Sequence, residues 1–196
     1  MAGLSALGSQ ARAAFVVPPL TGPVVDQAGV LDSSTVQALE NGLMALHNQG
    51  GSQINVLTVN ELGDVPIEQA SIQVVDKWKL GGAKLDNGVL LMVSAKDHHV
   101  RIEVGRGLEG VLTDVQSHRI IEEAMIPLFR SGDYNNAILV GVFQIVKLTD
   151  PNFDIKPYLE GSARVHRSRG GRGDSPLKLI IIIIFVAIYL ISRLFG

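Results

Sequence analysis

The chain has 196 residues, of which 46% are hydrophobic, and its formal net charge is -2. This length fits one domain with appendages. The near-neutral charge argues against a nucleic-acid-binding protein, whose folded part would be basic. The sequence contains no cysteine, which excludes disulfides, thiolate metal sites and cysteine nucleophiles.

The N-terminal residues carry a weak targeting signal. The segment Ala11-Arg12-Ala13, followed by Ala14, resembles a signal cleavage site of the A-x-A type, although residues 1–8 form too short an apolar core for a signal peptide. We interpret residues 1–14 as the remnant of a signal sequence, with a disordered N-terminal arm as the alternative. Three prolines within residues 15–25 block a helix there and predict an extended segment.

The first helix and strand have recognisable start and stop signals. The polar run at 32–34 predicts a helix start, with Ser34 and Gln37 as a capping box. Leucines at helical spacing continue the helix to His47, and two glycines end it. The alternating, β-branched segment Gln53–Asn60 then predicts a strand.

A second helix and a β-hairpin follow. Pro66 in the first turn and a shared apolar face predict a helix over Ile67–Lys79. The nearly continuous apolar segment Gly88–Ser94 predicts a buried strand. After a polar turn, His99–Val104 alternates apolar and charged residues, which predicts the second strand of a hairpin.

Two more helices complete the domain. Thr113 is expected to cap a helix that ends at Arg130, with a glycine as its stop. Asp133 is expected to cap the last helix, which continues through Lys147. The fold class is therefore α/β, with a small mixed sheet of three or four strands covered by helices.

The C-terminal part differs in composition from the domain. Residues 151–176 are interpreted as a flexible tether rich in glycine and arginine. Residues 180–191 are apolar on every face, and residues 177–195 span roughly 28 Å as a helix with Lys178 and Arg193 near its ends, which predicts one transmembrane helix. A buried core helix is the weaker alternative, since such a helix would be amphipathic at its edges.

Acidic and amide side chains gather near predicted strand ends. Asp26, Asp86, Asn87 and Glu109 are our candidate metal ligands, with Glu103 and Asp114 in reserve. Short oxygen-bearing side chains on glycine-rich loops suit Ca²⁺. The alternative for residues 86–88 is a turn in which the side chains bond their own backbone. The five histidines show no zinc spacing and no serine lies in a nucleophile elbow, so we assign no catalytic residue.

The segment Gly105–Gly110 satisfies the pattern G-x-G-x-x-G but lacks its dinucleotide-binding context. The following helix begins only after the glycines, and the loop leaves a hairpin rather than a parallel βαβ unit. Glu109 would also point a negative charge at a pyrophosphate. Such glycines more often allow close packing of backbone or offer carbonyl oxygens to a cation.

Four segments together resemble the TPM domain family over about residues 15–150. They are Val24–Leu31, Asp86–Leu91, Arg101–Gly110 and Phe129–Tyr134. The resemblance implies an α-β-α sandwich, a signal sequence and a C-terminal transmembrane helix. It also implies Ca²⁺ binding, weak acid phosphatase activity in some members and, among thylakoid-lumen relatives, a link to photosystem II repair.

The resemblance places the family's acidic positions at Asp26, Asp86 and Glu109. Arg106 stands where many relatives carry an aromatic residue, which lowers the negative charge of this loop. Glu103 lies in the same motif but alternates with inward-facing residues, so a solvent-facing position is expected for it.

We expect a non-enzymatic, membrane-tethered accessory domain that binds Ca²⁺ weakly and assists assembly or quality control of membrane protein complexes. The alternative is a metal-assisted acid phosphatase that uses the same acidic residues. The expected partners are the lipid bilayer and a membrane protein, without nucleic acid. The expected location is the inner (cytoplasmic) membrane, single-pass, with the domain facing the periplasm, although the arginines before residue 177 would favour the opposite orientation.

Overall fold

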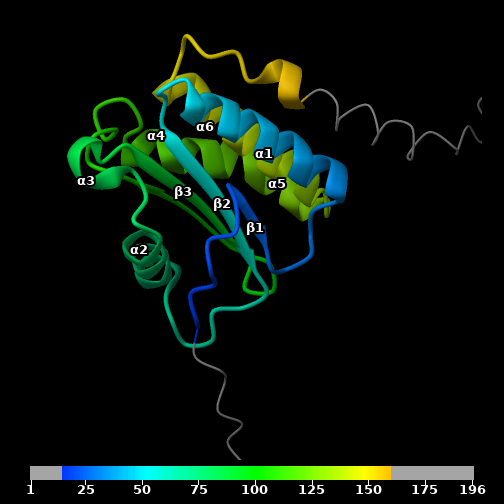
Figure 1. Ribbon diagram of the computed structural model, residues 1–196. Coiled ribbons are helices and arrows are strands. Elements are labelled where there is room, and N and C mark those ends of the chain that lie inside the picture. Colours follow the sequence, from blue (N-terminus) through cyan, green and yellow to red (C-terminus); the bar gives the residue numbers. More distant parts are fainter. Residues whose placement is uncertain (1–14, 160–196) are drawn as a thin grey trace, which may run out of the picture. The chain divides into compact units, whose positions relative to one another are not determined.

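The computed structural model describes residues 15–159, which contain a four-stranded mixed sheet in the order β1-β2-β3-β4 (Figure 1). The strands are β1 (Val24–Asp26), β2 (Gln53–Val59), β3 (Gly88–Ser94) and β4 (His99–Val104). β1, β2 and β3 run parallel, and β4 pairs antiparallel with β3. The mixed α/β fold predicted from the sequence is confirmed.

The predicted helices occur in the predicted order, and the structure adds one short helix, α3 (Gly82–Leu85), and one strand, β1. The helices are α1 (Ser33–Asn48), α2 (Ile67–Trp78), α3, α4 (Asp114–Arg119), the π-helix η1 (Ile120–Met125), α5 (Ile126–Arg130) and α6 (Tyr134–Thr149). The short helix α3 was not predicted. The segment expected only to be extended forms β1, because Val24 and Val25 pair with Val56 and Leu57 of β2.

Two hydrophobic cores lie on the two faces of the sheet. One core joins the sheet to α1, η1 and α6, and the other joins it to α2 and the N-terminal segment around Val17. Figure 1 shows α2 on one side of the sheet and α1, α5 and α6 on the other. All seven residues of β3 are buried, as expected for a strand covered on both faces.

Helix caps were predicted correctly at two of three positions. Thr113 caps α4 and Asp133 caps α6, each through its side chain. At α1 the cap is Asp32, whose Oδ1 accepts from Thr35 N at 2.7 Å. The capping box expected at Ser34 was therefore wrong, because Asp32, at the start of the same polar run, supplies the acceptor.

The helix expected over residues 113–130 is interrupted by a wide turn. In η1 the backbone hydrogen bonds shift by one residue, and Ile126 N–H donates to Ile121 O. Pro127 follows directly. Its missing N–H and its ring do not fit a regular α-helical turn, and a π-helical turn is a common way to absorb such a mismatch.

The folded part extends beyond the expected boundary at residue 150. Ile155 and Leu159 are buried in the core beside α1, and Phe153 packs against it. The tether expected from residue 151 therefore begins with core residues, because these apolar side chains cover an otherwise exposed part of α1. The helices formed between residues 15 and 159 are all too short or too polar to cross a membrane. The anchor predicted at residues 177–195 lies outside the described residues.

Met125 should be a major contributor to stability, because it is fully buried between η1 and α6. We expect Met125→Ala to lower the free energy of unfolding by about 2–5 kcal/mol through the cavity it leaves. Met44→Ala is the matched control, since Met44 is 51% exposed, and should change it by less than about 0.5 kcal/mol. Urea unfolding measures both, and equal losses would contradict this packing.

A second substitution tests the same contact. A Cβ added at Gly141 would lie 2.7 Å from the sulfur of Met125, so Gly141→Ala alone should destabilise the fold. In the Met125→Ala background that methyl group has space. We therefore expect the double variant to be more stable than the sum of the two single losses.

Candidate functional site

The direction of the strands separates the four candidate metal ligands. Asp26 ends β1 and pairs with Thr58 near the carboxyl end of β2. Asp86 and Asn87 precede β3, whose first residue pairs with Gln53 at the amino end of β2. Since the three strands are parallel, Asp26 lies at their carboxyl ends, whereas Asp86 and Asn87 lie at their amino ends.

Asp26 holds its own loop together. Its carboxylate accepts from Val30 N at 3.2 Å and from Leu31 N at 3.0 Å. It also accepts a hydrogen bond from the Thr58 hydroxyl. The carboxylate therefore ties the segment after β1 to the neighbouring strand β2.

Asp86 lies at the end of α3, in contact with the loop after β4. It has a positive φ of 45°, and its backbone oxygen accepts from Gly107 N at 3.0 Å. Its carboxylate pairs with the guanidinium of Arg106, with 3.1 Å between Oδ2 and Nε. Asp86 ends α3 and Gly88 already begins β3. The Asp86 side chain bonds Arg106 rather than its own backbone, unlike the turn that was one of the two interpretations.

The glycines of the G-x-G-x-x-G segment serve close backbone packing. A Cβ at Gly105 would lie 2.3 Å from Asp86 O, and one at Gly107 would lie 2.1 Å from Leu85 O. Gly110 has open space around it. The close approach expected from the sequence is confirmed for the first two glycines.

Glu109 lies on the same loop but faces a groove beside β4. This groove has a volume of about 320 Å³, and Glu103 and Asp114 also line it. Glu103 is not the solvent-facing residue that was expected. Its side chain is 20% exposed, and its Oε2 accepts from Ser71 of α2 at 2.7 Å and from Arg101 at 3.1 Å.

The acidic residues do not converge on one point. Within residues 15–159, no group of three or more histidine, aspartate or glutamate side chains is placed to hold a metal ion. Asp86 and Asn87 could contribute oxygen ligands at the amino edge of β3, and Glu109 and Asp114 could do so in the groove. Ca²⁺ binding therefore stays a prediction.

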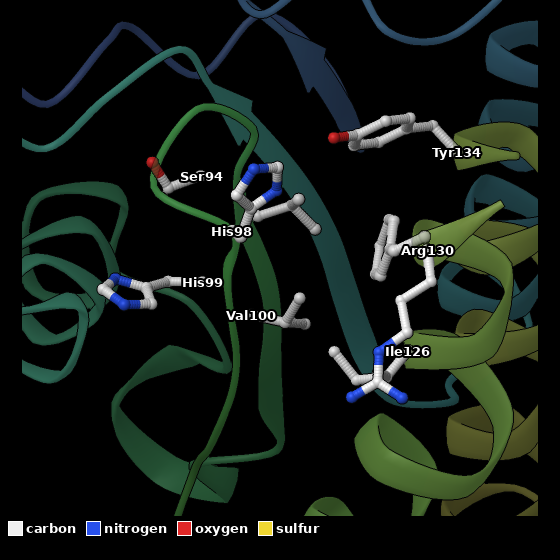
Figure 2. A pocket seen from close by; sticks show the side chains of 9 residues that line it. Ser94, His98, His99, Val100, Ile126, Arg130 and Tyr134 are labelled. Atoms are coloured by element: carbon white, nitrogen blue, oxygen red, sulfur yellow. The ribbon is translucent and has the colours of Figure 1, made fainter. Parts of the chain in front are cut away.

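A second cavity lies at the opposite end of β4, between the hairpin and α5. It has a volume of about 450 Å³, and Val93, Val100, Ile126 and Phe129 contribute to its walls. Figure 2 shows Val100 and Ile126 facing each other, with the hydroxyl of Tyr134 directed toward His98 across the opening.

The rim of this cavity is basic. His98 and Arg130 are exposed, and no carboxylate within residues 15–159 pairs with Arg130. Tyr134 is fixed by its ring contact with Phe129, with 5.2 Å between centroids, and by a long hydrogen bond of 3.5 Å to Ala95 O. The arrangement can hold an apolar group that carries a negative charge.

Sequence reasoning did not identify this cavity. The segment Phe129–Tyr134 was singled out as a motif, yet it was used only for the resemblance. His98 was considered only as one of five histidines without zinc spacing. Three aromatic or basic residues within one motif were a usable signal, but their position opposite His98 depends on the tertiary structure.

Comparisons with known proteins agree with this architecture. A model of the TPM domain family matches residues 24–148. The N-terminal domain of a protein from P. gingivalis, solved by NMR in solution, is 31% identical with a TM-score of 0.63. That match covers 77% of this chain and 95% of the other. The chain belongs to the TPM domain family.

A more distant structure shows the same fold. The N-terminal domain of the cg2496 protein from Corynebacterium glutamicum is 13% identical with a TM-score of 0.53, covering 73% of this chain and 91% of the other. No curated protein matches the sequence.

The two contrasting glycines of the loop after β4 give a direct test of its packing. We expect Gly107→Ala to lower the free energy of unfolding by about 1–3 kcal/mol, because the added methyl group meets backbone rather than a flexible side chain. Gly110→Ala is the control and should be nearly neutral. Chemical denaturation measures both, and equal effects would contradict the close approach to Leu85.

A calcium titration tests the prediction at Asp86. Because Arg106 already pairs with this carboxylate, we expect Arg106→Gln to strengthen Ca²⁺ binding and Asp86→Asn to abolish it. Asp26→Asn is the control, since Asp26 lies at the opposite ends of the parallel strands. Amide chemical shifts in the full-length chain report the binding. No shift up to ~10 mM, well above the range of weak extracellular sites, would leave residues 86–88 with only the structural role of joining α3 to β3.

Proposed function

We propose that this TPM-domain protein is a non-enzymatic, membrane-tethered accessory protein that binds a partner protein. The observation that carries the proposal is the cavity between the hairpin and α5. Its volume of about 450 Å³ and its apolar walls suit the side chain of a partner. Its basic rim can recognise a negative charge next to that side chain.

The positions of the acidic residues favour binding over catalysis. A metal-assisted phosphatase needs converging ligands for one or two metal ions, or an activated nucleophile. The phosphatase alternative would use Asp26 and Asp86 together. They lie at opposite ends of the parallel strands. The Asp86 carboxylate is also paired with Arg106. No contact within residues 15–159 specifically favours the phosphatase alternative.

The membrane tether and the location in this proposal rest on the sequence. The apolar segment at 177–195 supports an anchor, and the stretch at 11–14 supports export before that anchor is made. An accessory protein held at the inner membrane, with its domain in the periplasm, could assist assembly or quality control of membrane complexes. Weak Ca²⁺ binding at Asp86 and Asn87 would be a secondary property of the same domain.

Photo-crosslinking in native membranes tests the proposed binding surface. We expect a photoreactive amino acid at His98 to give discrete protein adducts that weaken when Arg130→Glu is added. The matched position is Gln73, which is exposed on α2 at the other face of the sheet, and it should give none of these adducts. The same adducts from both positions would contradict a specific surface. Phosphate-ester hydrolysis that is lost with Asp86→Asn would contradict the non-enzymatic assignment.

A further inference from the structure

The outer edge of β4 has unpaired backbone groups. Gly105 N–H donates to Gly88 O at 2.8 Å, which fixes the alternation of this antiparallel pair. His99, Arg101 and Glu103 therefore exchange hydrogen bonds with β3. The backbone groups of the residues between them point away from β3, and nothing within residues 15–159 bonds to them. These residues are Val100, Ile102 and Val104.

One cavity lies beside each half of this edge, and Ile102 near the middle of the edge is only 4% exposed. Residues 98–100 line the cavity of about 450 Å³, and residues 101–104 line the groove of about 320 Å³. The helical segment after the hairpin forms the other wall, with Thr113 and Asp114 at one end and Ile126 and Phe129 at the other. We call the two cavities together the β4 groove.

The two ends of the β4 groove carry opposite charges. At the end near the hairpin turn, His98 and Arg130 supply basic groups. At the other end, Glu109 and Asp114 are exposed carboxylates, and neither forms an ion pair within the described part of the chain. A ligand that spans the groove would need its negative group near Arg130 and its positive group near Glu109.

We propose that the β4 groove binds the C-terminal segment of a partner protein as an added, antiparallel β-strand. The C-terminal carboxylate meets Arg130 and His98, and the last side chain enters the apolar cavity. A basic side chain about five residues earlier meets Glu109 and Asp114. This inference rests on the proposed function and names the kind of segment that the cavity would receive.

The direction of the added strand follows from the charges. β4 runs from the basic end of the groove toward the acidic end. A segment with its carboxylate at the basic end must run the opposite way, which gives antiparallel pairing. The six residues of β4 span roughly 20 Å as a strand, so a partner segment of about six residues would fill the edge.

Other occupants would use only part of the groove. A fatty acid could fill the apolar cavity and pair with Arg130, but it has no backbone to bond the edge of β4. A nucleic acid would be repelled by Glu109 and Asp114. An extended peptide uses the apolar cavity, both charged ends and the unpaired edge, and strand addition is a common mode of peptide recognition.

A labelled peptide tests the carboxylate contact on the full-length chain. The probe is acetyl-Lys-Val-Thr-Val-Thr-Leu with a free carboxylate, compared with its C-terminal amide by fluorescence anisotropy. We expect the amide to bind about tenfold more weakly, the effect of losing one charged hydrogen bond. In Arg130→Gln the acid and amide should bind equally. Arg119→Gln is the control, because Arg119 pairs with Glu123 and lines neither cavity.

N-methylation of the peptide tests the strand pairing without altering the protein. Successive N–H groups of a strand point to opposite sides, so methylation at one set of alternate residues should reduce binding about tenfold or more. Methylation at the other set should have little effect. Equal effects of the two sets, equal binding of acid and amide, or no binding at ~1 mM would overturn the inference. Specific adducts from His98 in any of these cases would show that the proposed binding surface stands without strand addition.

Discussion

The position of β3 governs the arrangement of the rest of the domain. All seven of its residues are buried, and it lies between a parallel neighbour and an antiparallel one. Its amino end therefore meets the amino end of β2 and the carboxyl end of β4. Its carboxyl end meets the hairpin turn. The direction of β3 therefore determines at which of its two ends each neighbouring loop lies.

This arrangement separates Asp26 from Asp86 and Glu109. The segment that contains Asp86 and the loop that contains Arg106 and Glu109 meet at one edge, where glycines let two backbones approach within van der Waals contact. Asp26 remains at the carboxyl ends of the parallel strands, where it orders the loop after β1. The motifs at the amino end of β3 thus have a structural role, the close packing of the loop after β4 against residues 85 and 86. This packing accounts for Gly105, Gly107 and the Asp86–Arg106 ion pair.

The open edge of β4 has the features of an interaction surface. Proteins usually cover, shorten or charge an edge strand to prevent unwanted pairing. Here β1 is limited to three residues, while β4 keeps six and has cavities beside it. Arg101 and Glu103, which line the groove of about 320 Å³, pair with each other, and Glu103 also accepts from Ser71 of α2. This surface, rather than the glycine-rich loop, is where we place binding.

Local signals in the sequence were sufficient for most of the secondary structure. β3 and β4 have the predicted bounds, and Thr113 and Asp133 cap the predicted helices, because alternation, caps and glycine stops act over a few residues. The class of fold and the family also followed from the order of these segments. The sequence could not determine which loops lie together at the same end of the strands, since strand direction is a property of pairing between distant segments.

The tertiary structure alone decided the site. The cavity beside β4 combines residues from the hairpin and from α5, which are about thirty residues apart in the chain, and their spacing carries no local period. The packing of residues 151–159 likewise depends on a surface that forms only when α1 is in place. The sequence determined the elements and their order, and the pairing of β3 determined which of their side chains could act together.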